Sequence, residues 1–229
     1  MQVCNQFPFA GVCFLYPLEN NMLMQQVEWA KPVVHIYDKG VHNNADILEL
    51  DGFRIGRIIG EYLLQLGHQR IAFVTSTDRN TFSVKYRIEG IQETAFSLNL
   101  PDYAVQLVEF LDKHKKFSYY QDLFLNLITQ NRVTAFITAE SSTCTYLYDL
   151  LTSLDIKVPG DVSLMSFDKP VCSSRNPDFF THISQSEYLM GREAGTLLKN
   201  RIELYDINTY HRVITPTLHV HESTGSVCL

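Results

Sequence analysis

The sequence lacks the excess of basic residues that a DNA-binding surface requires. Its 229 residues include 25 acidic and 19 basic side chains, which gives a formal net charge of −6. Most non-specific affinity for nucleic acid comes from neutralising phosphates with lysine and arginine. The composition therefore argues against a nucleic-acid interface within these residues, and we expect that the chain by itself does not bind DNA specifically.

Cysteine is scarce and irregularly spaced. The sequence has five cysteines and no CxxC pair: Cys4, Cys13, Cys144, Cys172 and Cys228. An odd count at wide spacing favours reduced thiols over a disulfide framework or a zinc site. The N-terminal stretch has no basic region ahead of its apolar residues, contains Pro8 and is too short to span a bilayer. We expect a cytoplasmic protein that is neither exported nor anchored in a membrane.

Motifs for catalysis and for cofactor binding are missing as well. The sequence contains no GxSxG, no P-loop and no GxGxxG. His211, His219 and His221 lie close together, but no cluster of cysteines or carboxylates joins them at the spacing of metal ligands. We interpret them as solvated strand histidines. The sequence thus predicts no enzyme activity, no cofactor and no metal site.

The chain does have apolar runs that alternate with amphipathic segments. Hydrophobic residues make up 45% of the sequence, enough to build a buried core. Short apolar runs predict strands over 11–17, 32–37, 47–50, 70–75, 134–139 and within 156–168. Apolar residues at helical spacing predict helices over 20–30, 51–66, 83–98, 118–130, 142–154 and 185–204. A closing strand is predicted over 213–223, and this order indicates an α/β fold with parallel sheets.

The segment over 51–75 is the most informative single stretch. Asp51 is a suitable N-cap for the helix that follows, and Gly67 stands where a left-handed C-cap glycine belongs. The strand over 70–75 begins almost at once. Such a short connection between helix and strand is typical of a parallel α/β sheet.

Six stretches, in uninterrupted order over about residues 11–224, resemble the core of LacI/GalR-type bacterial transcription regulators. They are LDGFRIGRIIGEYLLQLGHQRIAFV (50–74), SVKYRIEGIQ (83–92), VTAFITAESS (133–142), IKVPGDVSLMSFD (156–168), THISQSEYLMGREAGTLL (181–198) and TPTLHVHEST (215–224). The resemblance includes an Asp, a glycine-bearing helix and Leu-Gly-His in the first stretch. It also includes Arg-x-x-Gly in the second and a Val-Pro-x-Asp-Val-Ser strand ending in aspartate in the fourth.

The resemblance implies a two-lobed, periplasmic-binding-protein-like fold of type I with parallel sheets. By this comparison, residues 1–50 form part of an N-terminal lobe, 51–182 form a C-terminal lobe, 183–210 return to the first lobe and 211–229 close the second. The chain should cross between lobes near 48–51, 181–185 and 208–213. The resemblance also implies that the first lobe is incomplete and that the DNA-binding headpiece lies outside this sequence.

Arg87 and Asp168 match family positions that bind the effector. Arg87 belongs to the Arg-x-x-Gly motif, and Asp168 ends the apolar strand VSLMSFD. Polar side chains at strand ends can contact the hydroxyl groups of a ligand in the cleft of an α/β sheet. The alternatives are an exposed helical arginine and an N-cap aspartate. We expect these two residues to lie along one cleft.

Four further residues are weaker candidates for effector binding. Glu140 and Ser141 stand where the family usually has Asn-Asp, and an N-cap pair is an equal alternative. Gln185 matches a cleft-facing family position, although a solvent-facing glutamine explains it too, and Asp38 fits after a slip of one residue. Phe82 and Phe179 could stack on a ligand, but simple packing is the usual role of such residues.

These features together predict an effector-sensing domain of a bacterial transcription regulator. The effector is expected to be a sugar or a sugar-like small molecule, and its binding would control operator DNA binding through a headpiece. The resemblance also implies a homodimer. Two alternatives stay open: a periplasmic sugar-binding protein of the same fold, and the core of a regulator with a GntR-type headpiece.

Overall fold

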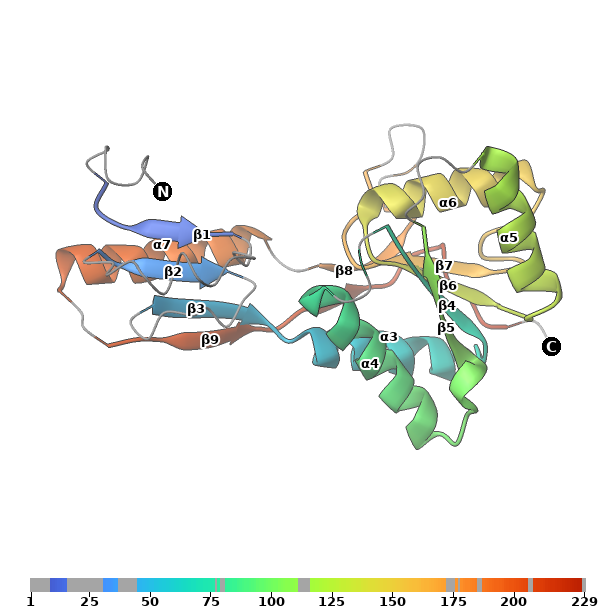
Figure 1. The fold of residues 1–229 in the computed structure, drawn as a ribbon, viewed down its shortest axis with the longest axis horizontal. Helices are drawn as coiled ribbons and strands as arrows, with labels where there is room; N and C mark the ends of the chain where they lie inside the picture. Colours follow the sequence, from blue (N-terminus) through green and yellow to red (C-terminus); the bar gives the residue numbers. More distant parts are fainter. Residues whose placement is uncertain are drawn as a thin grey trace. The chain divides into compact units, whose positions relative to one another are not determined.

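The computed structural model describes most of the chain and divides it into two compact units (Figure 1). The described residues are 9–15, 31–36, 45–76, 78, 81–110, 116–171, 176, 178–184, 187–205 and 208–227. Unit 1 comprises Met1–Asp51 and Gln185–Pro216, and unit 2 comprises Gly52–Ser184 and Thr217–Leu229.

Unit 1 contains a four-stranded parallel sheet. Its strands are β1 (Val12–Phe14), β2 (Val33–Ile36), β3 (Ala45–Leu50) and β9 (His211–Ile214), in that spatial order. Helix α7 (Glu187–Glu203) packs along the sheet and buries Met190, Ala194 and Leu197. The spacing of these three residues gives the helix its apolar stripe.

Unit 2 contains a six-stranded sheet in the order β10-β8-β7-β6-β4-β5. Its strands are β4 (Ile71–Thr75), β5 (Val105–Glu109), β6 (Ala135–Thr138), β7 (Ser163–Ser166), β8 (Thr181–Ser184) and β10 (Thr217–His219). All neighbours are parallel except β10, which runs antiparallel to β8. The α/β fold with parallel sheets is therefore confirmed.

Helices cover both faces of the sheet in unit 2, as Figure 1 shows. Helices α3 (Gly52–Gln65) and α4 (Phe82–Ser97) lie on one face, and α5 (Phe117–Thr129) and α6 (Ser141–Ser153) lie on the other. A short 3₁₀ helix, η1 (Asp102–Ala104), precedes β5. Strands β4, β6 and β7 are fully buried along their length. This burial explains why β4 and β6 appear in the sequence as mostly apolar runs.

The closing segment differs from the prediction. The sequence predicts one strand over 213–223, but the structure has β9 and β10 on either side of Pro216, in different sheets. Because proline has no N–H to donate, a continuous ladder cannot run through it. The segment predicted to close the second lobe from residue 211 begins with β9, which pairs with β3 in the sheet of unit 1, and unit 1 extends to Pro216.

Two strands of the structure are not predicted from the sequence. Strand β5 (VQLVE) carries polar residues within its apolar pattern, and β8 (THIS) is short and mostly polar. Neither forms the continuous apolar run that identifies a buried strand. The helix expected over 20–30 lies outside the described residues.

The turn between α3 and β4 has the geometry that the sequence predicts. Gly67 has a φ of +90°, in the left-handed region, and the N–H of His68 donates to the carbonyl of Leu63 at 3.0 Å. The His68 ring then lies buried beneath the C-terminal segment. Its nitrogens lie 3.0 Å from the Thr134 hydroxyl, 2.9 Å from the Ser163 hydroxyl and 3.0 Å from the Gly225 carbonyl. The Leu-Gly-His motif thus ends α3 at Gly67 and connects it, through the His68 ring, to the C-terminal segment at Gly225.

Helices α3 and α4 approach each other closely at two glycines. A Cβ atom at Gly56 would lie 2.1 Å from the Arg87 carbonyl oxygen, and one at Gly90 would lie 2.1 Å from that of Phe53. Glycine is required at both positions because any side chain would collide with backbone. The contact also fixes the backbone of Arg87.

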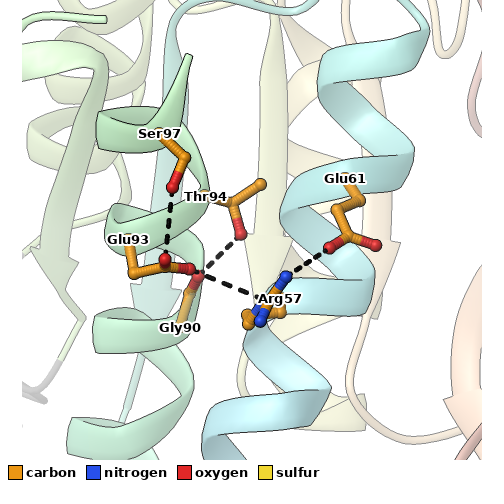
Figure 2. A network of polar contacts seen from close by, with 6 residues as sticks. All are labelled: Arg57, Glu61, Gly90, Glu93, Thr94 and Ser97. Carbon is orange, nitrogen blue, oxygen red and sulfur yellow. Dashed lines mark hydrogen bonds and ion pairs between the residues drawn. The ribbon is translucent and has the colours of Figure 1, made fainter. Parts of the chain in front are cut away.

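A polar network joins the same two helices at their surface (Figure 2). Arg57 of α3 pairs with Glu61 at 3.1 Å and with Glu93 of α4 at 3.5 Å. On α4, the Ser97 hydroxyl donates to Glu93 at 3.2 Å, and the Thr94 hydroxyl donates to the Gly90 carbonyl at 2.9 Å. The ion pairs are about half exposed, so close packing at the glycines contributes more to holding the helices together.

Candidate functional site

The polar candidates of unit 2 follow strands that are parallel neighbours. Strand β6 pairs with β4 on one side and with β7 on the other, all in parallel register. The carboxyl ends of these strands therefore meet at one edge of the sheet, where α/β proteins bind ligands. Ser76 follows β4, Glu140 follows β6 and Asp168 follows β7. We refer to this part of unit 2 as the strand-end edge.

Arg87 reaches the strand-end edge from the second turn of α4. Its guanidinium carbon lies 4.4 Å from the centre of the Phe167 ring, and the residue is buried. Phe167 in turn packs against Phe73 at 5.5 Å between ring centres. A cation over an aromatic face is stabilised by the ring quadrupole. Arg87 is therefore not the exposed helical arginine that was the alternative, and it lies beside the residue that precedes Asp168.

The Glu140 carboxylate accepts three hydrogen bonds from residues of unit 2. The donors are the Thr75 hydroxyl at 2.9 Å, the Ser76 N–H at 3.0 Å and the Thr143 hydroxyl at 2.9 Å. Glu140 also occupies the N-cap position of α6. The carboxylate thus links the end of β4 to the start of α6, and it supports the geometry of the strand-end edge.

Ser141 and Asp168 belong to the same edge. The Ser141 hydroxyl accepts a hydrogen bond from the Val171 N–H at 3.3 Å, which connects the start of α6 to the segment after β7. The Asp168 N–H donates to the Ser166 hydroxyl at 3.4 Å, and its side chain is half-buried. The roles of Arg87, Asp168, Glu140 and Ser141 in binding an effector remain predictions.

The other predicted residues do not join this cluster in the part of the chain that the structure describes. Asp38, Gln185 and the side chain of Phe82 lie outside the described residues. Phe179 packs against Tyr148 and Phe180, with ring centres 5.6 and 5.0 Å away, so it has the packing role that was its alternative.

Three residues at the strand-end edge were missed by the sequence analysis. Thr75 and Ser76 hold Glu140, and Phe167 supports Arg87. A pair of hydroxyl residues directly after an apolar strand is a signal that could have indicated Thr75 and Ser76. Phe167 gives no such signal, because a phenylalanine that ends an apolar run is usually core.

The histidines are arranged differently from the expectation of solvated strand residues. His211 and His219 are exposed, but His221 lies beyond the end of β10 and is partly buried. The rings of His219 and His221 pack against the buried His182. Among the described residues, no group of three histidine, cysteine or acidic side chains is arranged to hold a metal ion. No helix in the described ranges is long and apolar enough to cross a membrane.

Comparison with known proteins agrees with the resemblance seen in the sequence. The chain is 25% identical over 201 residues to the HTH-type transcriptional repressor PurR of Haemophilus influenzae, covering 84% of this chain and 57% of the repressor. The chain therefore spans little more than half the length of that relative.

Solved structures share the fold. A LacI-family regulator from Enterococcus faecium with bound ribose gives a TM-score of 0.74 at 23% identity, over 86% of this chain and 72% of that one. A complex of the transcriptional regulator CelR with cellobiose gives 0.73 at 23% identity, over 93% and 65%. The profile of the periplasmic binding protein-like domain matches residues 61–224, well over half of the sequence. This chain therefore belongs to the family of periplasmic binding protein-like domains.

Proposed function

We propose that the chain is the effector-sensing domain of a bacterial transcription regulator and that the strand-end edge of unit 2 binds a sugar or sugar-like molecule. The observation that carries this proposal is the placement of Arg87 against Phe167, directly before Asp168. Two similar structures hold ribose and cellobiose, which supports a carbohydrate effector.

The chemistry of the edge suits hydroxyl groups. A guanidinium offers several N–H donors in a fixed plane, and a carboxylate offers several acceptor sites. In our proposal, Arg87 donates to the ligand and Asp168 accepts from it. Glu140 and Ser141 border the site and keep its geometry through their bonds to Ser76, Thr143 and Val171. Asp38 and Gln185, which the sequence also predicts to bind the effector, lie outside the described residues.

Calorimetric titration of the purified chain with D-ribose and with cellobiose tests the sugar class. Asp168→Asn keeps the size of the side chain and removes its charge, whereas Arg87→Lys keeps the charge and loses the planar donors. We expect each substitution to weaken sugar binding by about 1–3 kcal/mol. Asp149→Asn is the matched control, because Asp149 is an exposed carboxylate on α6.

Two outcomes would contradict the proposed site. If neither sugar binds to the wild-type chain, the proposed class of effector is wrong. If a sugar binds but the Asp168 and Arg87 variants retain wild-type affinity, the effector site lies elsewhere. Circular dichroism of each variant establishes that a loss of binding does not come from unfolding.

In the intact regulator, we propose that effector binding changes affinity for operator DNA through a helix-turn-helix segment, as the name of the PurR relative indicates for that protein. Such coupling requires that the effector bind the two states of the regulator with different affinities. We further propose a cytoplasmic homodimer. Gel-shift titrations of the intact regulator with and without sugar test the coupling, and sedimentation equilibrium tests the dimer.

A further inference from the structure

Three histidines gather at the end of the sheet in unit 2 that is formed by β8 and β10. His182 of β8 lies directly opposite His219 of the antiparallel β10. The ring centres of His182 and His219 are 4.9 Å apart, and those of His182 and His221 are 5.5 Å apart. The rings of His219 and His221 are separated by 6.5 Å. We call these three residues the histidine stack.

The rings lie nearly parallel, with angles between their planes of 7–11°. His182 is almost fully buried, at 4% exposure. Its Nδ1 lies 2.9 Å from the Phe180 carbonyl oxygen, which can only accept, so Nδ1 carries a hydrogen and donates it. A second proton must therefore enter at Nε2, and it places a charge on a buried ring.

Burial and the groups around His182 make that second proton unfavourable. Burial lowers the pKa of His182 below its ordinary value of 6.5, and the nearby His219, His221 and Lys169 lower it further, against an opposing effect of the Phe180 hydrogen bond. Asp178 also faces the cluster, but Lys169 forms an ion pair with it at 2.9 Å. On the other side of β8, His182 pairs in register with Ser166 of β7, which is uncharged.

The strand that closes the stack is weakly held. Strand β10 is three residues long, forms the outer edge of the sheet and pairs only with β8 among the described strands. The chain beyond it is firmly anchored, because the buried Ser223 accepts from the Thr181 N–H at 2.9 Å and donates from its own N–H to the Phe179 carbonyl at 3.0 Å. His221 is anchored too, because its N–H donates to the Thr181 hydroxyl at 2.9 Å, and opening can therefore be confined to residues 217–220.

We propose that the histidine stack is a protonation-sensitive clasp that holds β10 on β8 when its imidazoles are neutral and releases it when they become charged. Protons taken from solvent would place like charges within 4.9–6.5 Å of each other, and such charges repel. The clasp lies beside both chain connections, since unit 2 ends at Ser184 and resumes at Thr217. The inference rests on unit 2 alone and does not depend on the proposed function.

Hydrogen exchange of backbone amides, followed by NMR, tests the clasp. The chain would be measured between about pH 7 and about pH 5, where histidine titrates, after correction for the intrinsic exchange rate. In the wild-type chain, we expect the opening of residues 217–219 to increase by about tenfold over this range. The double variant His219→Gln/His221→Gln should show a clearly smaller dependence, while Leu164 in β7 remains protected in both proteins.

His211→Gln is the matched control. His211 is an exposed histidine of unit 1 whose Nε2 lies 2.7 Å from the Glu49 carboxylate. A positive charge on its ring would therefore be next to a negative charge, and not next to other imidazoles. This variant should respond to pH as the wild type does. An equal response in the double variant, or no response in the wild type, would overturn the proposal.

A second measurement covers the case in which the double variant folds poorly. NMR titration of the wild-type chain gives the pKa of His182 directly. We expect titration clearly below the ordinary histidine value together with loss of the β8–β10 amide protection over the same range. A His182 that titrates normally, or that titrates while β10 stays protected, would contradict the clasp.

Discussion

Each unit buries a titratable side chain, Asp46 in unit 1 and His68 in unit 2, and the two side chains have different kinds of hydrogen-bond partner. Unit 1 uses a charged pair: Asp46, which is fully buried, accepts from Arg201 Nε at 2.8 Å, from Arg201 Nη2 at 3.0 Å and from the Tyr210 N–H at 2.8 Å. Unit 2 uses neutral groups: His68 lies among the hydroxyls of Thr134 and Ser163 and the carbonyl of Gly225.

This difference determines which changes should destabilise each unit. Removing one partner of a buried ion pair strongly destabilises a protein, because the remaining charge is left in a low-dielectric environment. A neutral network loses less when one member is removed, but it is sensitive to any pH at which that member becomes charged. Unit 1 is therefore vulnerable to loss of a partner, and unit 2 is vulnerable to acid.

The largest expected effect comes from breaking the ion pair of unit 1. Asp46→Ala leaves the Arg201 guanidinium, whose side chain is 9% exposed, without its carboxylate. We expect a loss of about 3–5 kcal/mol in the stability of unit 1. Hydrogen exchange should show reduced protection in β3, β9 and α7 and unchanged protection in β4, β6 and β7.

Lys199→Ala on the same helix is the control. It removes an exposed ion pair with Glu203 at 3.7 Å, and we expect a change within about 1 kcal/mol. Equal loss of protection in both units after Asp46→Ala would show that their stabilities are not separate, and the comparison would then fail.

The second prediction compares glycines in the helices of the two units. Gly90→Ala in α4 forces a Cβ against the Phe53 carbonyl oxygen, so α3 and α4 must separate, at a cost of about 1–3 kcal/mol. Gly191→Ala in α7 meets no atom within 4 Å. It should stabilise unit 1 by up to about 1 kcal/mol, since alanine is the better helix former. Thermal unfolding of both variants tests this account of the helix contact. A melting temperature that does not fall for Gly90→Ala, or that falls equally for Gly191→Ala, would refute it.

The third prediction concerns the response of unit 2 to acid. Burial lowers the pKa of His68 below 6.5, and this outweighs the opposing effect of the hydrogen bond to Gly225. A lowered pKa in the folded state means that the unfolded chain binds the proton more tightly. The stabilisation by neutral His68 is then complete above about pH 6.5 and is lost as the pH falls through the folded-state pKa.

His68→Gln tests this directly. Near neutral pH the variant should be less stable by about 1–3 kcal/mol, because the buried groups around residue 68 lose partners. As the pH falls, the difference from the wild type should shrink. Denaturant titrations over a series of pH values measure it, and a difference that stays constant or grows in acid would contradict the neutral state of His68.

The smallest expected effect is at the surface network of Figure 2. Arg57→Ala removes contacts to Glu61 and Glu93 that are about half exposed, and we expect a loss of no more than about 1 kcal/mol. Added salt should weaken the wild type towards the variant. A loss as large as that of Gly90→Ala would mean that charges, and not the close approach of glycines, hold α3 to α4.

The sequence by itself determined the local features of this protein. The helix over 52–65, its C-cap at Gly67 and the buried strand over 71–75 all follow from periodicity, capping and short-range backbone preferences. The resemblance to LacI/GalR-type regulators identified the fold class and the strand-end positions of Glu140 and Asp168. These signals suffice because each depends on residues that are neighbours along the chain.

Only the tertiary structure decided which polar groups meet. Glu140 binds Thr75 and Ser76, more than sixty residues earlier, and Arg87 packs on Phe167. The split at Pro216 and the histidine stack likewise depend on which strands pair. A side chain satisfies its hydrogen bonds with whatever the fold brings near it. The sequence around that side chain does not specify a partner from a distant strand, and so the contacts that shape the candidate site could not be predicted from it.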